Sequence, residues 1–199
     1  NAYVKGLSGC EETLEIPQTL TDENQKTKKV EVIGQYAFNY CGDKDYTYGI
    51  TRSIVLSRYI KVIKYQGLGA MSEVTSFRIE EGSCLESIES YGLSYMSFEN
   101  YDEDARSGIL VLPSTVTSIA ENGLYDNNLI KTIYYCGSTH LSNYCELKYG
   151  EVSNPDIKVT SSYTYDKIFG SYTPKKDSSS IAEAEGICDK YKPEASPSP

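Results

Sequence analysis

The sequence predicts a solenoid, α/β or mainly β, in which short units of chain stack around one elongated core. The first observation is a spacing: the apolar alternation at Leu110 and Leu112 returns at Ile133, 23 residues after Leu110. The second is a pattern of an aliphatic residue, an isoleucine three residues on, and phenylalanine or leucine five residues after that. It occurs at Val30-Ile33-Phe38, Ile60-Ile63-Leu68, Leu85-Ile88-Leu93 and Val116-Ile119-Leu124. A small residue precedes the large one in each unit (Ala37, Gly67, Gly92 and Gly123), which lets neighbouring coils approach closely. Such a period indicates stacked repeats, because one unit cannot bury its apolar face alone.

Strand-like pairs of apolar residues mark where the units begin. They are Leu14/Ile16, Ile54/Leu56, Phe77/Ile79, Leu110/Leu112 and Ile133/Tyr135. The repeat region, residues 1–170, then divides into a partial coil at 1–13, full units at 14–53, 54–76, 77–109 and 110–132, and a last strand with a terminal cap at 133–170. The first and third units carry insertions, and we expect the polar insertion at 18–29 in the first unit to be a solvated loop. Since strand side chains alternate faces, we expect the paired residues to point inward and the four pattern isoleucines to lie in single file.

Two motifs resemble those of a known family. One is the run from Ile33 to Cys41 with Ala37-Phe38 inside it, and the other is Leu112-Pro113 followed by Val116 and Ile119. They are similar to the BspA-like leucine-rich repeat family, surface proteins of mucosal protozoa and bacteria, over roughly residues 7–170. The resemblance implies leucine-rich repeat coils with irregular insertions, and binding to host matrix proteins, host cells or other microbes. The chain differs in having leucine for phenylalanine in three of the four units.

Composition excludes several classes of partner. The net charge of −9 argues against nucleic acid, whose phosphates are bound by Lys and Arg, and against anionic membranes. No apolar run approaches the roughly 20 residues that span a bilayer, so we expect no direct membrane insertion within this chain. The 19 tyrosines have two interpretations. They form an adhesive surface, since tyrosine offers a large area at low entropic cost, or they replace Phe and Leu at half-buried positions.

The cysteines leave several pairings open. They are Cys10, Cys41, Cys84, Cys136, Cys145 and Cys188. Six cysteines permit fifteen pairings, between which sequence does not choose. We expect Cys41 to be a buried free thiol, and Cys136 with Cys145 to be candidates for a disulfide that closes the terminal cap. With no Cys-x-x-Cys and one histidine, His140, in a polar turn, the sequence predicts no metal site, no catalytic residues and no cofactor.

Two surfaces are candidates for protein binding. The first is the outward row of the opening strands, which includes Arg78, Val111 and Tyr134. Stacked coils present such a row as a continuous face. The alternative is that small and β-branched residues in the row merely suit strands.

The second candidate surface is formed by two insertions. Tyr46 and Tyr48 lie in one, and Phe98, Tyr101 and Asp102 lie in the other, after the same repeat position two coils away. Strands are about 4.8 Å apart, so both loops should leave the same edge roughly 10 Å from each other. Aromatic and acidic side chains on protruding loops suit a basic protein partner. The alternative is a pair of tolerated surface insertions.

From residue 171 to 199 the composition changes to a polar tail. Ser180 to Glu183 matches a capping box, which predicts a short helix over 181–191, and the Pro/Ser-rich end reads as a disordered linker or stalk. The start at Asn1, inside a repeat, suggests upstream coils or a signal peptide beyond the sequence. We therefore expect a non-enzymatic adhesion module, secreted or on the cell surface, that binds a host matrix or cell-surface protein. The alternative is a structural subunit that docks through its repeat faces into a larger assembly.

Overall fold

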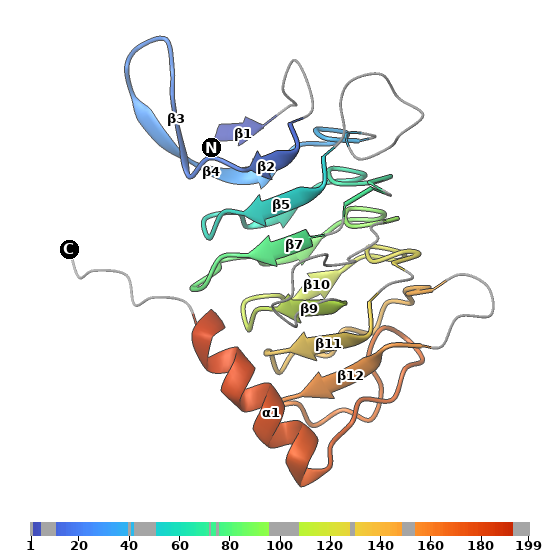
Figure 1. Ribbon diagram of the computed structural model, residues 1–199. Helices are drawn as coiled ribbons and strands as arrows, with labels where there is room; N and C mark the ends of the chain where they lie inside the picture. The colour runs from blue at the N-terminus through green and yellow to red at the C-terminus, as the bar shows by residue number, and fades with distance from the viewer. Residues whose placement is uncertain are drawn as a thin grey trace.

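The computed structural model describes residues 2–4, 11–39, 41, 51–71, 73–74, 76–95, 108–127, 130–148 and 154–192. Strands from successive repeat units lie side by side in chain order (Figure 1). Helix α1 (Ser178–Cys188) crosses the C-terminal end of the stack and continues into the 3-10 turn η1 (Asp189–Tyr191). Among the described residues, neither helical segment has the length and hydropathy of a membrane span.

The described strands form three sheets. The largest has the spatial order β1 (Ala2–Val4), β4 (Thr27–Ile33), β6 (Val62–Ile63), β8 (Ser87–Ile88) and β10 (Ser118–Ile119), all parallel, with β3 (Thr19–Thr21) antiparallel to β4. The opening strands of the units form the other two. One holds β2 (Thr13–Glu15), β5 (Ser53–Leu56) and β7 (Ser76–Ile79), and the other holds β9 (Ile109–Leu112), β11 (Thr132–Tyr135) and β12 (Asp156–Val159).

The four pattern isoleucines lie in single file in the largest sheet. Their register pairs are Ile33 with Ile63, Ile63 with Ile88, and Ile88 with Ile119. None of them is more than 2% exposed. The predicted alignment is therefore confirmed, and it gives the core a continuous row of aliphatic contacts between neighbouring units.

The opening strands pair as predicted but in two groups. Their inward rows are Leu14–Ile54–Phe77 and Leu110–Ile133–Ile157. Strands β7 and β9 belong to different sheets, so the expectation of one continuous outward face is wrong. The break coincides with the third unit, which carries the insertion between Leu93 and Leu110.

The phenylalanine or leucine that ends the repeat pattern in each unit forms a further row. Here the backbone N–H of Leu68 donates to the carbonyl of Gly92 at 3.0 Å, and that of Leu93 donates to Gly123 at 3.0 Å. A Cβ on Gly92 would lie 2.9 Å from both the Glu89 carbonyl oxygen and Ile88 Cγ2. Glycine before the large residue therefore lets the turn pack against the isoleucine row, as the pattern predicts.

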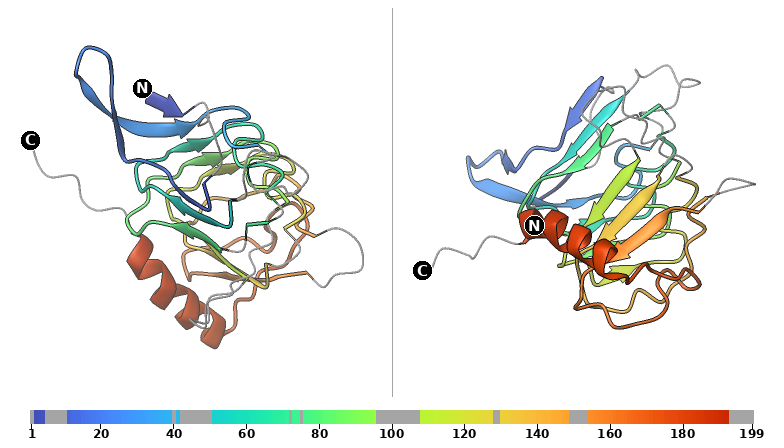
Figure 2. Two further views of the ribbon diagram at one scale, coloured as in Figure 1. Left: turned by 45° about the horizontal axis from the view of Figure 1, so that its top comes forward. Right: turned by 60° about the horizontal axis from the view of Figure 1, so that its bottom comes forward.

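The first insertion differs from its prediction. The polar stretch at 18–29 was expected to be a solvated loop, and it is instead a hairpin in which Thr19 pairs with Lys29 and Thr21 with Thr27 (Figure 2). Its turn is held by Asp22, whose carboxylate accepts the N–H groups of Asn24 and Lys26, each at 2.9 Å. Aspartate stabilises turns through such local hydrogen bonds, which a reading of polarity alone overlooks.

The predicted C-terminal helix exists but begins three residues earlier. Asp177, not Ser180, is its N-cap, and the Ser180 backbone N–H donates to the Asp177 carboxylate at 3.0 Å. The helix packs against β11 and β12. Backbone bridges before it join Tyr172 to Ile168 and Lys175 to Lys158, so the chain stays in contact with the repeats across residue 170. The Pro/Ser-rich end from residue 193 lies outside the described residues.

Two cysteine expectations are wrong. Cys136 forms a disulfide with Cys188 at the end of α1, not with Cys145, which is a buried free thiol. The helix returns across β11 and brings the two sulfurs together over a sequence separation of 52 residues. Cys41 is disulfide-bonded and not a free thiol.

Candidate functional site

Five partly exposed tyrosines form an aromatic row across four repeat units. They are Tyr36, Tyr65, Tyr91, Tyr125 and Tyr95. Successive ring centroids lie 5.4, 6.2, 5.4 and 5.3 Å apart, and each pair meets edge to face. Edge-to-face pairs contribute about 0.5–1.5 kcal/mol beyond their buried area, so the row is an ordered surface. We call it the tyrosine row.

The backbone turns that follow the four pattern isoleucines in sequence position the tyrosine row. Three residues after each pattern isoleucine the backbone has a positive φ, at Tyr36, Gln66, Tyr91 and Asn122. Each turn is hydrogen-bonded to the next: the N–H of Tyr36 donates to the Tyr65 carbonyl at 3.2 Å, and that of Tyr91 donates to Asn122 at 3.0 Å. The tyrosines therefore follow the spacing of the strands beneath them.

The ends of the tyrosine row are its most accessible part. Tyr36 is 50% exposed and Tyr95 is 42% exposed, while the three tyrosines between them are half-buried. Burial, together with the charge and hydrogen bond of Tyr36, raises the pKa of Tyr65, so its hydroxyl stays protonated at neutral pH. Tyrosine combines an apolar ring with a hydrogen-bonding tip, the chemistry enriched at protein interfaces.

Charged groups flank the middle of the tyrosine row. The Glu89 carboxylate accepts the backbone N–H of Tyr65 at 3.0 Å and forms an ion pair with Lys64 at 2.6 Å. Glu121, one unit further, is exposed. Glu89 and Lys64 thus neutralise each other beside Tyr65, and the chain as a whole has a net charge of −9.

The structure separates the three predicted residues of the outward row. Arg78 on β7 is exposed, and Val111 on β9 is half-buried. Tyr134 pairs with Val111 in register, as predicted, but it is only 4% exposed because α1 covers it. The expectation that Tyr134 presents a contact surface is therefore wrong in this structure.

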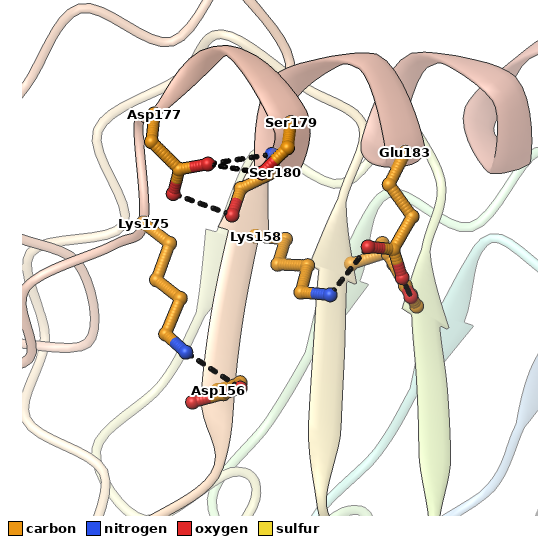
Figure 3. Close-up of polar contacts among 8 residues, drawn as sticks. Asp156, Lys158, Lys175, Asp177, Ser179, Ser180 and Glu183 are labelled. Carbon is orange, nitrogen blue, oxygen red and sulfur yellow. Dashed lines mark hydrogen bonds and ion pairs between the residues drawn. The ribbon is translucent and has the colours of Figure 1, made fainter.

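Tyr134 is instead part of the contact between sheet and helix. Its hydroxyl donates to Glu183 of α1, and Glu183 also pairs with Lys158 of β12 at 2.6 Å (Figure 3). Burial first, and the Glu183 carboxylate second, raise the pKa of Tyr134 well above its usual range. Lys158 and Tyr134 lower the pKa of Glu183. These groups hold α1 on the outward face of β11 and β12.

The first turn of α1 provides a test of this contact. Asp177→Ala is expected to fray that turn, because the carboxylate accepts hydrogen bonds from the Ser180 N–H and hydroxyl (Figure 3). Hydrogen bonds from Ser179 and Ser180 lower the Asp177 pKa below its ordinary 3.8. Because the pKa of Asp177 is lower in the folded protein than its ordinary 3.8, the Asp177 carboxylate stabilises the fold above pH 3.8. This stabilisation is lost as the pH falls through the folded-state pKa. Faster amide exchange at Ser180 would report the fraying.

A matched control for this test is Asp166→Ala. The Asp166 side chain is 99% exposed, and its ion pair with Lys176 is long, at 3.7 Å. It should leave the exchange at Ser180 unchanged. Equal exchange in both variants would contradict the capping role of Asp177.

The structure does not test the candidate binding surface predicted for the two insertion loops. Tyr46, Tyr48, Phe98, Tyr101 and Asp102 all lie outside the described residues.

His140 is exposed, as expected of a polar turn, and its ring stacks on Tyr165 with centroids 4.4 Å apart. Within the described ranges, no group of three or more His, Cys, Asp or Glu side chains could hold a metal ion.

The sequence interpretation missed the tyrosine row as a unit. One signal was present, since Tyr36 and Tyr91 both stand three residues after a pattern isoleucine. The others occupy different offsets, and only the backbone turns bring them together. No family model, curated protein or solved structure matches the chain.

Proposed function

We propose that this chain is a leucine-rich-repeat solenoid of the BspA-like type and acts as a non-enzymatic adhesion module, secreted or on the cell surface. Its partner is a host matrix or cell-surface protein with a basic contact region. The observation that carries the proposal is the tyrosine row, an ordered aromatic surface that crosses four repeat units. The aligned isoleucine file supports the repeat architecture beneath it.

The choice of a basic partner follows from charge and ring chemistry. Glu89 contacts the row at Tyr65, and the chain as a whole is acidic. Arg and Lys side chains bind both to carboxylates and to the faces of tyrosine rings. Complementary charge also steers such partners together, an effect that salt weakens.

The proposal predicts that Tyr36→Asn with Tyr95→Asn weakens binding at least about tenfold, because rigid aromatic side chains dominate interface energies. These rings are the most exposed of the row, and asparagine tolerates the positive φ of 55° and 56° at the two positions. Binding would be measured on immobilised basic and acidic matrix proteins and on host cells, at low and physiological salt.

The control for the double variant is Tyr165→Asn, since Tyr165 is 43% exposed and outside the tyrosine row. It should bind like the parent chain. If the double variant keeps full affinity while Tyr165→Asn also does, the tyrosine row is not the contact surface. If the parent chain binds only to proteins of its own organism, it is a structural subunit and the adhesion proposal fails.

A further inference from the structure

A cavity of about 500 Å³ opens at the C-terminal end of the repeats. Its lining combines two tyrosines, Tyr144 and Tyr172, with polar side chains from three segments of the chain, among them Glu146, Lys148, Asn154 and Ser171. The volume lies within the roughly 300–1,000 Å³ typical of small-molecule sites. The cavity is separate from the tyrosine row, and no residue of the row lines it.

The backbone of Tyr144 and the side chain of Tyr172 are held in place by their surroundings. Gly170 has φ +79°, and a Cβ there would lie 2.9 Å from the Tyr144 Cα, so only glycine allows the two segments to approach this closely. The Tyr144 carbonyl accepts the N–H of Asn122 at 3.0 Å. The Tyr172 hydroxyl accepts the backbone N–H of Leu147 at 3.2 Å, so a ligand would meet one ring that is already positioned and one, Tyr144, that is exposed beside it.

The cavity holds a lysine, Lys148, and a carboxylate, Glu146, that do not form an ion pair with each other. Lys148 also forms no ion pair with any other carboxylate of the residues that the structure describes. Burial, and then the nearby charge of Lys131, lower the pKa of Lys148. A bound anion would compensate both effects, because opposite charges attract more strongly where water is partly excluded.

Other polar groups in the cavity suit hydroxyls more than a second anion. The Asn154 amide and the Ser171 hydroxyl form no hydrogen bond with other described residues, so both are available to a ligand. An amide both donates and accepts hydrogen bonds, and the Glu146 carboxylate accepts them. A sugar hydroxyl can donate and accept, so it can pair with either group. A carboxylate in the same cavity also disfavours ligands with several negative charges.

We propose that this cavity binds an acidic monosaccharide, with its carboxylate at Lys148, its ring between Tyr144 and Tyr172, and its hydroxyls on Asn154, Ser171 and Glu146. The proposal does not depend on the tyrosine row or on the partner inferred for it. It adds a second ligand, of a different chemical class, at the C-terminal end of the repeats.

The test compares D-glucuronate with D-glucose, because the two sugars differ only in the carboxylate. Calorimetry or ligand-observed NMR on the full chain should show saturable binding of glucuronate or of N-acetylneuraminate, and binding of glucose at least about tenfold weaker. Lys148→Gln and, separately, Tyr144→Ser should each weaken binding of the acidic sugar about tenfold or more. Lys28→Gln, in the β3–β4 hairpin, should leave it unchanged.

Three outcomes would overturn the proposal. One is the absence of saturable binding of both acidic sugars at millimolar concentration. Another is equal binding of glucuronate and glucose, unaffected by Lys148→Gln. The third is inorganic phosphate binding as tightly as glucuronate with Tyr144→Ser neutral, which would make the cavity a simple anion site.

Discussion

Ile88→Ala is expected to lower the free energy of unfolding by about 2–5 kcal/mol, the range for truncating a buried aliphatic side chain to alanine. Ile88 is 1% exposed and stands in the file between Ile63 and Ile119, in register with both. Truncation of the Ile88 side chain leaves a cavity. Backbone hydrogen bonds to both neighbouring units prevent this cavity from collapsing. In a stacked repeat each unit is stabilised by its neighbours, so the damage should extend to both sides.

Urea unfolding of this variant, followed by circular dichroism, measures the loss. Ile88→Val is the matched control, with an expected cost of about 0.5–1.5 kcal/mol because it removes a single methylene group. A cost for Ile88→Ala no larger than that for Ile88→Val would mean that the isoleucine file does not hold the units together.

Cys188→Ser is expected to lower the free energy of unfolding by about 2–4 kcal/mol, because the Cys136–Cys188 disulfide closes a long loop in the unfolded chain. It should also loosen α1, which then keeps only the burial of Ala184 and the hydrogen bond and ion pair of Glu183 with Tyr134 and Lys158 as its main contacts with the sheet. The amides of α1 should then exchange faster. The chain has no tryptophan, so tyrosine absorbance and fluorescence would report the exposure of Tyr134.

A variant is a cleaner test here than a reducing agent, because Cys41 is also disulfide-bonded and would be reduced at the same time. Cys84→Ser is the control, since Cys84 is a free thiol. It should leave the exchange of α1 unchanged. If α1 in Cys188→Ser stays as protected as in the parent chain, the disulfide is not what holds the helix on the sheet.

The parts of the fold that sequence predicted are those set by local periodicity. The isoleucine file follows from one aliphatic residue recurring at a fixed place in each unit, and the glycine before each leucine follows from close packing at that place. Both features follow from comparing short segments at the same place in each unit. The registers of β6, β8 and β10 then repeat the same arrangement.

The parts that sequence missed depend on contacts between distant segments. Cys136 and Cys188 meet only because α1 folds back over β11, and the same return covers Tyr134. The tyrosine row has a similar origin, because Tyr65 and Tyr125 occupy different positions in their units and are brought beside Tyr91 by the turns. Proximity in sequence carried no information about these pairs.

The left-handed turns also limit how this sequence can vary. A β-branched side chain is strained at positive φ, whereas glycine, asparagine and aspartate adopt it readily. Substitution of a turn residue by valine, isoleucine or threonine is therefore disfavoured, and the distance from isoleucine to turn is the same in all four units. Insertions lie outside this short segment, as at 18–29 and between Leu93 and Leu110, so the scaffold stays constant while the rest of each unit can diversify.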